Sequence, residues 1–230
     1  MDLKHCPSSA TLADFSFGNG FSTSEIVLRA HISACRHCRT KIREIETIGS
    51  DLLMNDFHNQ LGTFSEDIDS KVDEIVEGYD SSCDRNSAKS LNLSKSKADD
   101  FELDDSLDCL FPSYLDCSFD ALPWKSAGKD IQLCKLREDG NSRLWMIKGK
   151  PGAKLPKHSH RGQELTLVLK GAYACSSNIY QPGDLHECDD ENTHQPIIVG
   201  EVDCISLVAT EGNLKFDNPF LRLIQPMLGI

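Results

Sequence analysis

The second half of the chain contains a short motif whose residue types commonly bind metal ions. Its defining residues are Gly152, His158, His160, Glu164 and Gly171. On a β-strand, side chains two apart share a face, so His158 and His160 point the same way and Glu164 has the same parity. A second element supplies His194. Three imidazoles and one carboxylate can bind zinc or another divalent metal such as iron, manganese or nickel.

His186 competes with His194 for the fourth position in this site. His186 lies only three residues after Gly183, early on the outgoing strand. The longer spacing to His194 leaves room for a strand, a turn at residues 189–192 and a returning strand, so His194 is favoured. The alternative is that these are surface histidines that bind no metal. That alternative is disfavoured, because four residues of suitable type would then match the spacing of a metal site by accident.

A second cluster of metal-binding residue types lies near the N-terminus, in the pattern His31-x3-Cys35-x2-Cys38. The spacings of four, three and seven predict that these residues share one side of a helix. Two thiolates and an imidazole are ligands for tetrahedral zinc, and Cys6 or His5 can supply the fourth. A redox Cys-x-x-Cys pair is an alternative, but no βαβ context precedes it, and ordinary buried cysteines are another.

The elements that position the two clusters differ in type. Before residue 80 the signals are helical, with helices expected at residues 9–18, 25–38, 39–48 (ending at Gly49) and 64–79. After residue 108 the chain has short β-rich stretches broken by turns at intervals of about ten residues, which is typical of an antiparallel sandwich or barrel. Leu165, Leu167 and Leu169 point to the outer face of one strand. We expect that face to be covered by a second sheet, another subunit or another element.

The segment between these halves is acidic, and 14 of the 36 acidic residues lie between Glu66 and Asp108. Its polar second part cannot bury enough surface to offset the entropy of ordering it. The predicted organisation is therefore α+β and multidomain: a zinc-stapled helical domain at 1–80, an acidic flexible linker at 81–108 and a metal-binding β-domain at 109–230. A solvated helical face is the alternative interpretation of the acidic segment.

Charge and hydropathy exclude several classes of partner. The formal net charge is −12, which argues against direct binding of nucleic acid or of an anionic membrane. No apolar run approaches the roughly 18–20 residues that span a bilayer, and the N-terminus lacks the apolar region of a secretory signal. We therefore expect a cytoplasmic protein. In a reducing compartment its ten cysteines are more often metal ligands or redox centres than disulfides.

The β-rich half resembles the cupin family, a small β-barrel with a metal in its mouth. The first cupin motif is matched at every defining position, whereas the second has its Gly183–Asp184 start and its histidine but lacks the usual Pro-x-Gly. The N-terminal half resembles the zinc-binding anti-sigma domain, in which a histidine near the N-terminus joins a helical His-x3-Cys-x2-Cys. Here that slot holds Cys6, with His5 before it.

The combination resembles the ChrR class of anti-sigma factors. The likeness includes residues 158–169, His194–Gln195–Pro196 and Asp203–Cys204, and it covers about three quarters of the chain. The resemblance implies a non-enzymatic protein that binds and inhibits an extracytoplasmic-function sigma factor and releases it in response to singlet oxygen or organic peroxide through the cupin. The chief alternative is a metal-dependent cupin enzyme such as a dioxygenase or isomerase. Another is a regulator that contacts DNA directly. A homodimer through the cupin is left open.

Overall fold

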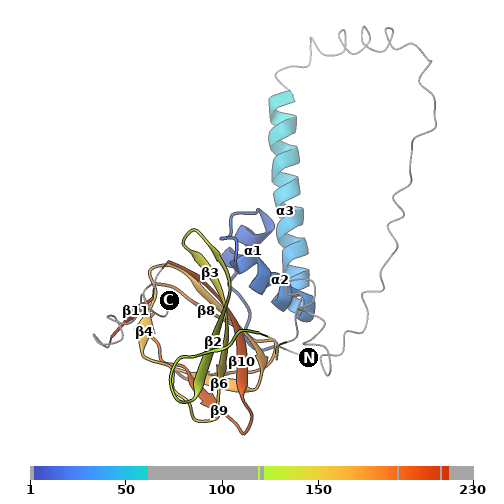
Figure 1. Cartoon of the computed structure of the whole chain (residues 1–230). Helices are drawn as coiled ribbons and strands as arrows, with labels where there is room; N and C mark the ends of the chain where they lie inside the picture. The colour runs from blue at the N-terminus through green and yellow to red at the C-terminus, as the bar shows by residue number, and fades with distance from the viewer. Residues whose placement is uncertain (1–2, 62–118, 120–121, 191, 213, 218–230) are drawn as a thin grey trace, which may run out of the picture. The chain divides into compact units, whose positions relative to one another are not determined.

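The computed structural model describes residues 3–61, 119, 122–190, 192–212 and 214–217, and the side chains of 55–61 and 216 are left undescribed. The predicted helix at 64–79 and the acidic linker at 81–108 lie outside these ranges. The described chain has three helices followed by eleven short strands (Figure 1). None of the described helices is long and apolar enough to cross a membrane.

Helix α1 spans Ser9–Ser16 and begins at a side-chain cap. The hydroxyl of Ser8 accepts a hydrogen bond from the amide of Thr11 at 3.1 Å, which satisfies one of the free N–H groups of the first turn. The helix ends at Phe17, and Gly18 follows with a φ of +71°. This helix matches the one expected at residues 9–18.

Helices α2 and α3 divide the histidine–cysteine motif differently from the single helix predicted at 25–38. Helix α2 spans Ser24–Ala34 and α3 spans Arg36–Leu61, with Cys35 extended between them at φ −95° and ψ 108°. The prediction was wrong because Cys35 caps the next helix: its sulfur accepts from the amide of Cys38 at 3.5 Å. Helix α3 also continues past Gly49, since an interior glycine costs a helix only about 1 kcal/mol.

The strands form a cupin-like β-domain in three hydrogen-bonded sets. The six-stranded antiparallel sheet has the order β1-β2-β3-β10-β5-β8, a three-stranded sheet has the order β7-β6-β9, and β4 pairs with β11. Among the described residues, no continuous ladder of hydrogen bonds closes the predicted barrel. The strand bounds are β1 Lys125–Ser126, β2 Ile131–Asp139, β3 Ser142–Gly149, β4 His158–Ser159, β5 Glu164–Lys170, β6 Ala172–Cys175, β7 Asn178–Tyr180, β8 Leu185–Cys188, β9 Ile197–Val199, β10 Cys204–Glu211 and β11 Lys215–Phe216.

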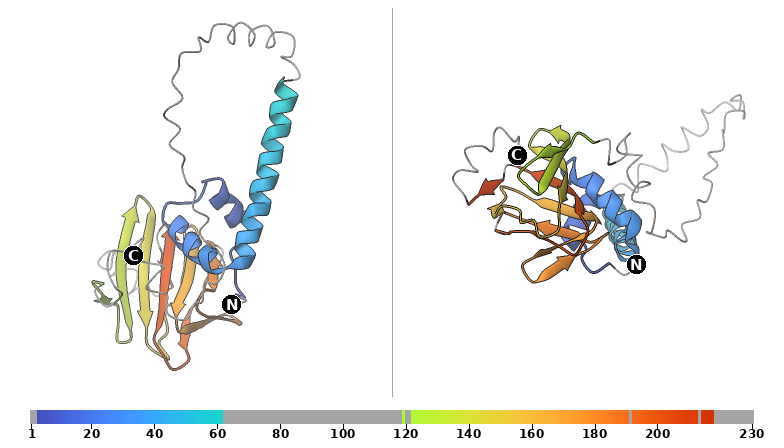
Figure 2. Two further views of the ribbon diagram at one scale, coloured as in Figure 1. Left: turned by 90° about the vertical axis from the view of Figure 1, so that its right-hand side faces the viewer. Right: turned by 60° about the horizontal axis from the view of Figure 1, so that its bottom comes forward.

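Helix α2 covers the outer apolar face of the six-stranded sheet (Figure 2). Because side chains alternate along a strand, Leu165, Leu167 and Leu169 all lie on this face, where they share one buried cluster with Val27 and Leu28 of α2. The expectation that an element covers this face is confirmed, and that element is helix α2.

The opposite faces of the same strands point into the β-domain. Val168 belongs to a second buried cluster with Tyr173 and Ile198, and Thr166 lines an internal cavity of about 580 Å³. Both faces of β5 are therefore covered, and the first six of its seven residues are buried.

Candidate functional site: two metal-binding clusters

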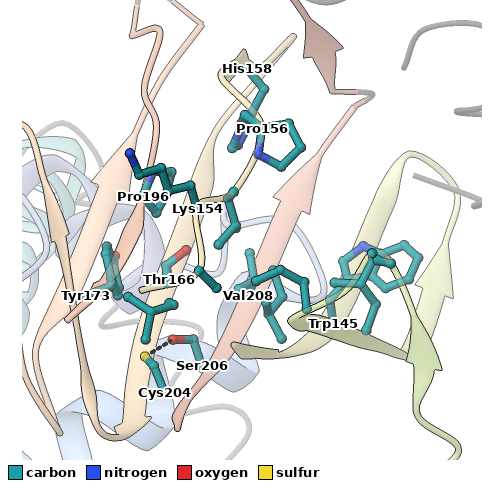
Figure 3. A pocket seen from close by; sticks show the side chains of 18 of the residues that line it. Trp145, Lys154, Pro156, His158, Thr166, Tyr173, Pro196, Cys204, Ser206 and Val208 are labelled. Carbon is teal, nitrogen blue, oxygen red and sulfur yellow. Dashed lines mark hydrogen bonds between the residues drawn. The ribbon is translucent and has the colours of Figure 1, made fainter. Parts of the chain in front are cut away.

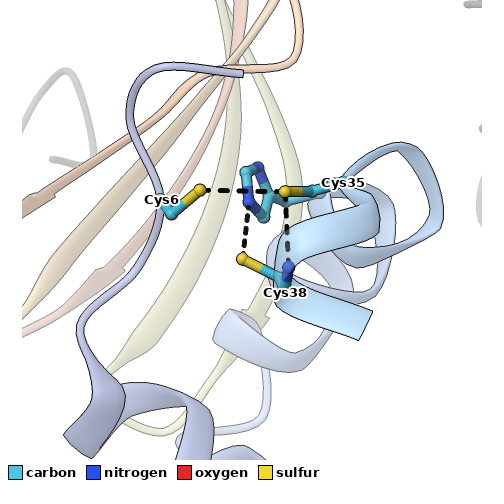
Figure 4. Close-up of side chains that lie close together, drawn as sticks. Cys6, Cys35 and Cys38 are labelled. Carbon is cyan, nitrogen blue, oxygen red and sulfur yellow. Dashed lines mark hydrogen bonds between the residues drawn. The ribbon is translucent and has the colours of Figure 1, made fainter. Parts of the chain in front are cut away.

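The structure brings together the four predicted N-terminal residues, Cys6, His31, Cys35 and Cys38, with their potential ligand atoms within 4.8 Å of one another (Figure 4). They come from three segments: the extended chain before α1, helix α2, and the α2–α3 junction. The sulfurs of Cys6 and Cys35 are 3.7 Å apart, and Nε2 of His31 is 3.3 Å from the sulfur of Cys38. His31 and Cys38 are fully buried.

His5, the other residue considered for the fourth position, lies elsewhere. Its ring packs against that of Tyr180, with centroids 4.5 Å apart. Of the two neighbours, the structure therefore places Cys6 in the cluster.

The pKa values of the three thiols differ. A hydrogen bond from Cys38, opposed by burial, lowers the pKa of Cys35 to about 3. The same bond raises the pKa of Cys38, and burial raises the pKa of Cys6 to about 11. Without a metal ion, only one of the three thiols is expected to ionise. Three thiolates this close together would repel one another unless a cation lay between them. The donor set fits a metal ion that accepts sulfur and nitrogen ligands.

The four predicted cupin residues, His158, His160, Glu164 and His194, also converge, again with their ligand atoms within 4.8 Å. Nε2 of His194 is 2.9 Å from Nε2 of His158 and 3.3 Å from Nε2 of His160. The carboxylate oxygens of Glu164 are 3.5 Å from His160 Nε2 and 3.8 Å from His194 Nε2. All four residues are buried.

Local backbone structure explains how these side chains meet. His158 and His194 form an antiparallel bridge in which they exchange two backbone hydrogen bonds of 3.1 and 2.9 Å. The strand breaks after β4, so His160 lies in the bend before β5 and Glu164 begins β5. This bend lets the histidines and the carboxylate share one site without lying on one continuous strand.

The protonation states of the cupin cluster suit metal binding. Burial lowers the pKa of His160, and it lowers the pKa of His194 to about 4. Burial acts to raise the pKa of Glu164, but the three neighbouring imidazoles prevail and lower it. Neutral His160 and His194 beside an ionised Glu164 are in the forms that coordinate a divalent metal.

Hydrogen bonds from outside the cluster fix the orientation of two of its rings. Nδ1 of His158 lies 2.8 Å from the carbonyl of Pro156, which makes Nδ1 the donor and directs the unprotonated Nε2 toward the cluster. Nδ1 of His194 lies 3.0 Å from the sulfur of Cys188. Burial raises the pKa of that thiol.

His186, the competitor for the fourth position, points into a neighbouring group. Its Nδ1 is 3.0 Å from the hydroxyl of Tyr173, and its Nε2 is 3.2 Å from the sulfur of Cys188. His186 could also form part of a three-donor group with Cys175 and His194. The structure thus places His194, and not His186, with the other three predicted ligands.

The internal cavity opens beside the cupin cluster (Figure 3). His158 and Glu164 line it together with apolar side chains such as Trp145 and Val208. Cys204 also lines it, and its sulfur is 3.7 Å from the hydroxyl of Ser206. A small, largely apolar molecule in this cavity would lie next to the histidine cluster.

Two acidic residues also position the N-terminal cluster, and only one of them, Asp184, was named from the sequence, as the start of the second cupin motif. Asp184 and Glu187 accept hydrogen bonds from the segment that carries Cys6. Their partners lie about 180 positions away in the sequence, so no local pattern could have identified them.

Comparison with known proteins places both clusters in a family context. Residues 114–213 match the family described as the ChrR cupin-like domain. Over 232 residues the chain is 26% identical to the anti-sigma-E factor ChrR of Cereibacter sphaeroides, with 100% of both chains covered.

A solved structure shows a similar fold. The chain is similar to one in the crystal structure of Rhodobacter sphaeroides SigE in complex with the anti-sigma ChrR, with a TM-score of 0.63 and 23% identity over 91% of this chain and 99% of that chain. An RmlC-like cupin protein from Ralstonia eutropha is 17% identical over 45% of this chain and 71% of that one, with a TM-score of 0.40. The family match and the full-length similarity to ChrR confirm the resemblance to ChrR-type anti-sigma factors, and residues 114–213 match the ChrR cupin-like domain.

Proposed function

We propose that this chain is an anti-sigma factor that binds and inhibits an extracytoplasmic-function sigma factor. The observation that carries the proposal is similarity along the whole chain to an anti-sigma factor, including the N-terminal helices. The role is regulatory and needs no catalytic group. A sigma-factor inhibitor acts where RNA polymerase is, so the proposal places the protein in the cytoplasm. Its partner is a protein, and neither nucleic acid nor a membrane is bound directly.

In this proposal the N-terminal cluster holds zinc. Tetrahedral zinc with Zn–S bonds of about 2.3 Å separates its sulfur ligands by roughly 3.8 Å, and the sulfurs of Cys6 and Cys35 are 3.7 Å apart. Zinc would supply a rigid four-way crosslink. Cys6, His31, Cys35 and Cys38 would then tie the N-terminal segment, α2 and the start of α3 into one unit, because metal-binding free energy in small domains is folding free energy.

Helix α3 offers a surface for the sigma factor. Ile48, Leu52, Leu53 and Met54 are between 59% and 72% exposed, although large apolar side chains favour burial. Ile48 and Leu52 are four residues apart and therefore lie on one side of the helix. We propose that this apolar stretch contacts the sigma factor, because the similar ChrR chain is an anti-sigma factor whose crystal structure is a complex with SigE.

The cupin half would control release. We propose that His158, His160, Glu164 and His194 hold zinc or another divalent metal, and that singlet oxygen or an organic peroxide acts at this site or at a neighbouring thiol such as Cys188. The cavity beside the cluster would admit such a small molecule. Residues 1–80 then form the sigma-binding domain, 81–108 the linker and 109–230 the sensor, and a homodimer through the cupin is compatible with this division.

Coexpression with the extracytoplasmic-function sigma factors of the same genome tests the proposal. One of them should copurify with the full chain, and the complex should fail to support transcription from that sigma factor's promoters in vitro. Leu52→Asp should abolish copurification, whereas Val202→Asp, at a similarly exposed site on the cupin (52%), should not. A correctly folded, metal-loaded chain that retains none of these sigma factors would contradict the proposal.

A further inference from the structure

The exposed edge of the six-stranded sheet is occupied by the N-terminal segment. Strand β8 is the last strand in the sheet order, and the amide of Leu185 at its start donates to the carbonyl of His5 at 3.0 Å. Just before it, Asp184 accepts from the amides of Lys4 and His5 at 2.9 and 3.1 Å. The segment that ends in Cys6 is thus held by the cupin edge.

Asp184 is specialised for this contact. Its side chain is 3% exposed, and its second carboxylate oxygen accepts from the amide of Gln181 at 3.0 Å. A buried carboxylate needs such donors, and hydrogen bonds to an ionised acceptor are about twice as strong as neutral ones. Three backbone amides therefore satisfy Asp184, and two of them belong to the segment that ends in Cys6.

The residue before Asp184 orients a second member of the N-terminal cluster. Nδ1 of His31 lies 2.8 Å from the carbonyl of Gly183, which makes Nδ1 the donor and leaves Nε2 directed at Cys38. Gly183 has a φ of +89°, and a Cβ there would lie 2.6 Å from a methyl carbon of Leu3. The positive φ favours glycine at this turn, and any larger residue would also displace the side chain of Leu3.

We propose that the cupin turn Gly183–Asp184 is the outer shell of the N-terminal metal site, so that the cupin sets how tightly the anti-sigma half holds its metal. The inference rests on the proposed zinc site. Two adjacent cupin residues orient His31 and the segment that carries Cys6, two parts of the cluster that are far apart in the sequence. Such partners fix ligand geometry, and removing one typically weakens metal binding by about 10- to 100-fold.

The same strand also reaches the cupin cluster. Strand β8 runs from Leu185 to Cys188, and the sulfur of Cys188 lies 3.0 Å from Nδ1 of His194. The end of this strand therefore contacts the cupin cluster, and the turn immediately before its start contacts His31 of the N-terminal cluster. A displacement of β8 at the cupin cluster would move the turn that supports the N-terminal site, and by linkage the coupling acts equally in both directions.

Cobalt binding to the full chain tests the proposal, because Co²⁺ bound by thiolates absorbs in the near ultraviolet while a histidine–carboxylate site lacks this band. The variants are Asp184→Asn, which is nearly isosteric but loses the charge, and Asp203→Asn as the matched control. Asp203 is another cupin aspartate; its side chain is 36% exposed, and its carboxylate lies 3.6 Å from Nζ of Lys148. Loss of the thiolate band to a competing chelator should be at least about tenfold faster in Asp184→Asn than in wild type. Asp203→Asn should match wild type.

Equal rates in Asp184→Asn and Asp203→Asn would overturn the proposal. If Asp184→Asn does not fold, Glu187→Gln decides, because Glu187 accepts from the amide of Ser8 at 2.7 Å and from the hydroxyl of Thr11 at 2.6 Å on the same edge. A rate at least threefold above wild type supports the coupling, and an unchanged rate overturns it. A wild-type chain without any thiolate band would instead refute the zinc site itself.

Discussion

The two four-residue clusters are built in opposite ways. The N-terminal cluster gathers ligands from three separate segments, and two of these depend on hydrogen bonds to the cupin turn. The cupin cluster is preformed: His158 and His194 are paired through their backbones, and Glu164 begins a strand that is buried on both faces. We therefore expect a bound metal to determine the geometry of the N-terminal cluster, whereas the β-sheet determines the geometry of the cupin cluster.

The largest expected effect comes from removing a ligand of the first cluster. Cys38→Ser removes a fully buried sulfur and should eliminate one of the two metal equivalents that we propose for the full chain. Because the metal ties the N-terminal segments together, sigma-factor affinity should fall by at least about 100-fold. Metal analysis and binding measurements on the purified full chain check both results.

Cys134→Ser is the matched control, since Cys134 is a buried cysteine of the β-sheet core outside both clusters. It should keep both metal equivalents and the affinity for the sigma factor. Full metal content and full affinity in Cys38→Ser would contradict the metal-dependent shape of the first site.

Acid should act on the second cluster through its histidines. In the metal-free protein, burial holds the pKa of His194 at about 4, below its ordinary value, so the unfolded chain binds a proton at a higher pH than the folded chain. The free energy of unfolding is therefore highest above about pH 6.5 and falls as the pH drops toward 4. The full pKa difference of His194 between the two states corresponds to roughly 3 kcal/mol. The lowered pKa of Glu164 removes further stability below about pH 4.5.

Denaturant unfolding of the metal-free chain between pH 7 and pH 4.5 measures this effect. His194→Gln should flatten the decline, because glutamine does not titrate. A metal-free wild type whose unfolding free energy is constant over this range would show that the cupin cluster is not buried as described.

Three residues of each cluster could be predicted from sequence because the spacings of His31-x3-Cys35-x2-Cys38 and His158-x-His160-x3-Glu164 are local. The fourth members, Cys6 and His194, lie 25 and 30 residues from their nearest partners in the sequence, and each had a competing histidine. The helix break at Cys35 could not be predicted, since the helical spacing of His31, Cys35 and Cys38 is also satisfied when Cys35 caps a second helix. Burial of Leu165, Leu167 and Leu169 was expected. The sequence could not show that α2 buries them, because α2 and β5 are separated by more than a hundred residues. Long-range polar contacts such as those of Asp184 have no local signature.

The smallest expected effect concerns the start of α1. Ser8 caps this helix and also donates its amide and hydroxyl to Glu187 at 2.7 and 3.2 Å. Ser8→Ala removes the hydroxyl with its hydrogen bonds to Thr11 and Glu187 but keeps the amide, so it should lower the unfolding free energy by about 1 kcal/mol. Thermal unfolding of the metal-loaded chain measures the change. Ser50→Ala, on an exposed turn of α3, provides the control and should have little effect, and an equal loss in both variants would remove the special role of Ser8.

The central claim is that the first cluster holds the sigma factor and the second controls its release. Oxidant-triggered release from the purified sigma-factor complex, compared between wild type and His160→Gln, tests it most directly. His160 is 1% exposed and belongs only to the cupin cluster. The account predicts sigma-factor affinity within threefold of wild type and loss of the oxidant response. Loss of sigma binding in His160→Gln, or release at the wild-type rate, would contradict it.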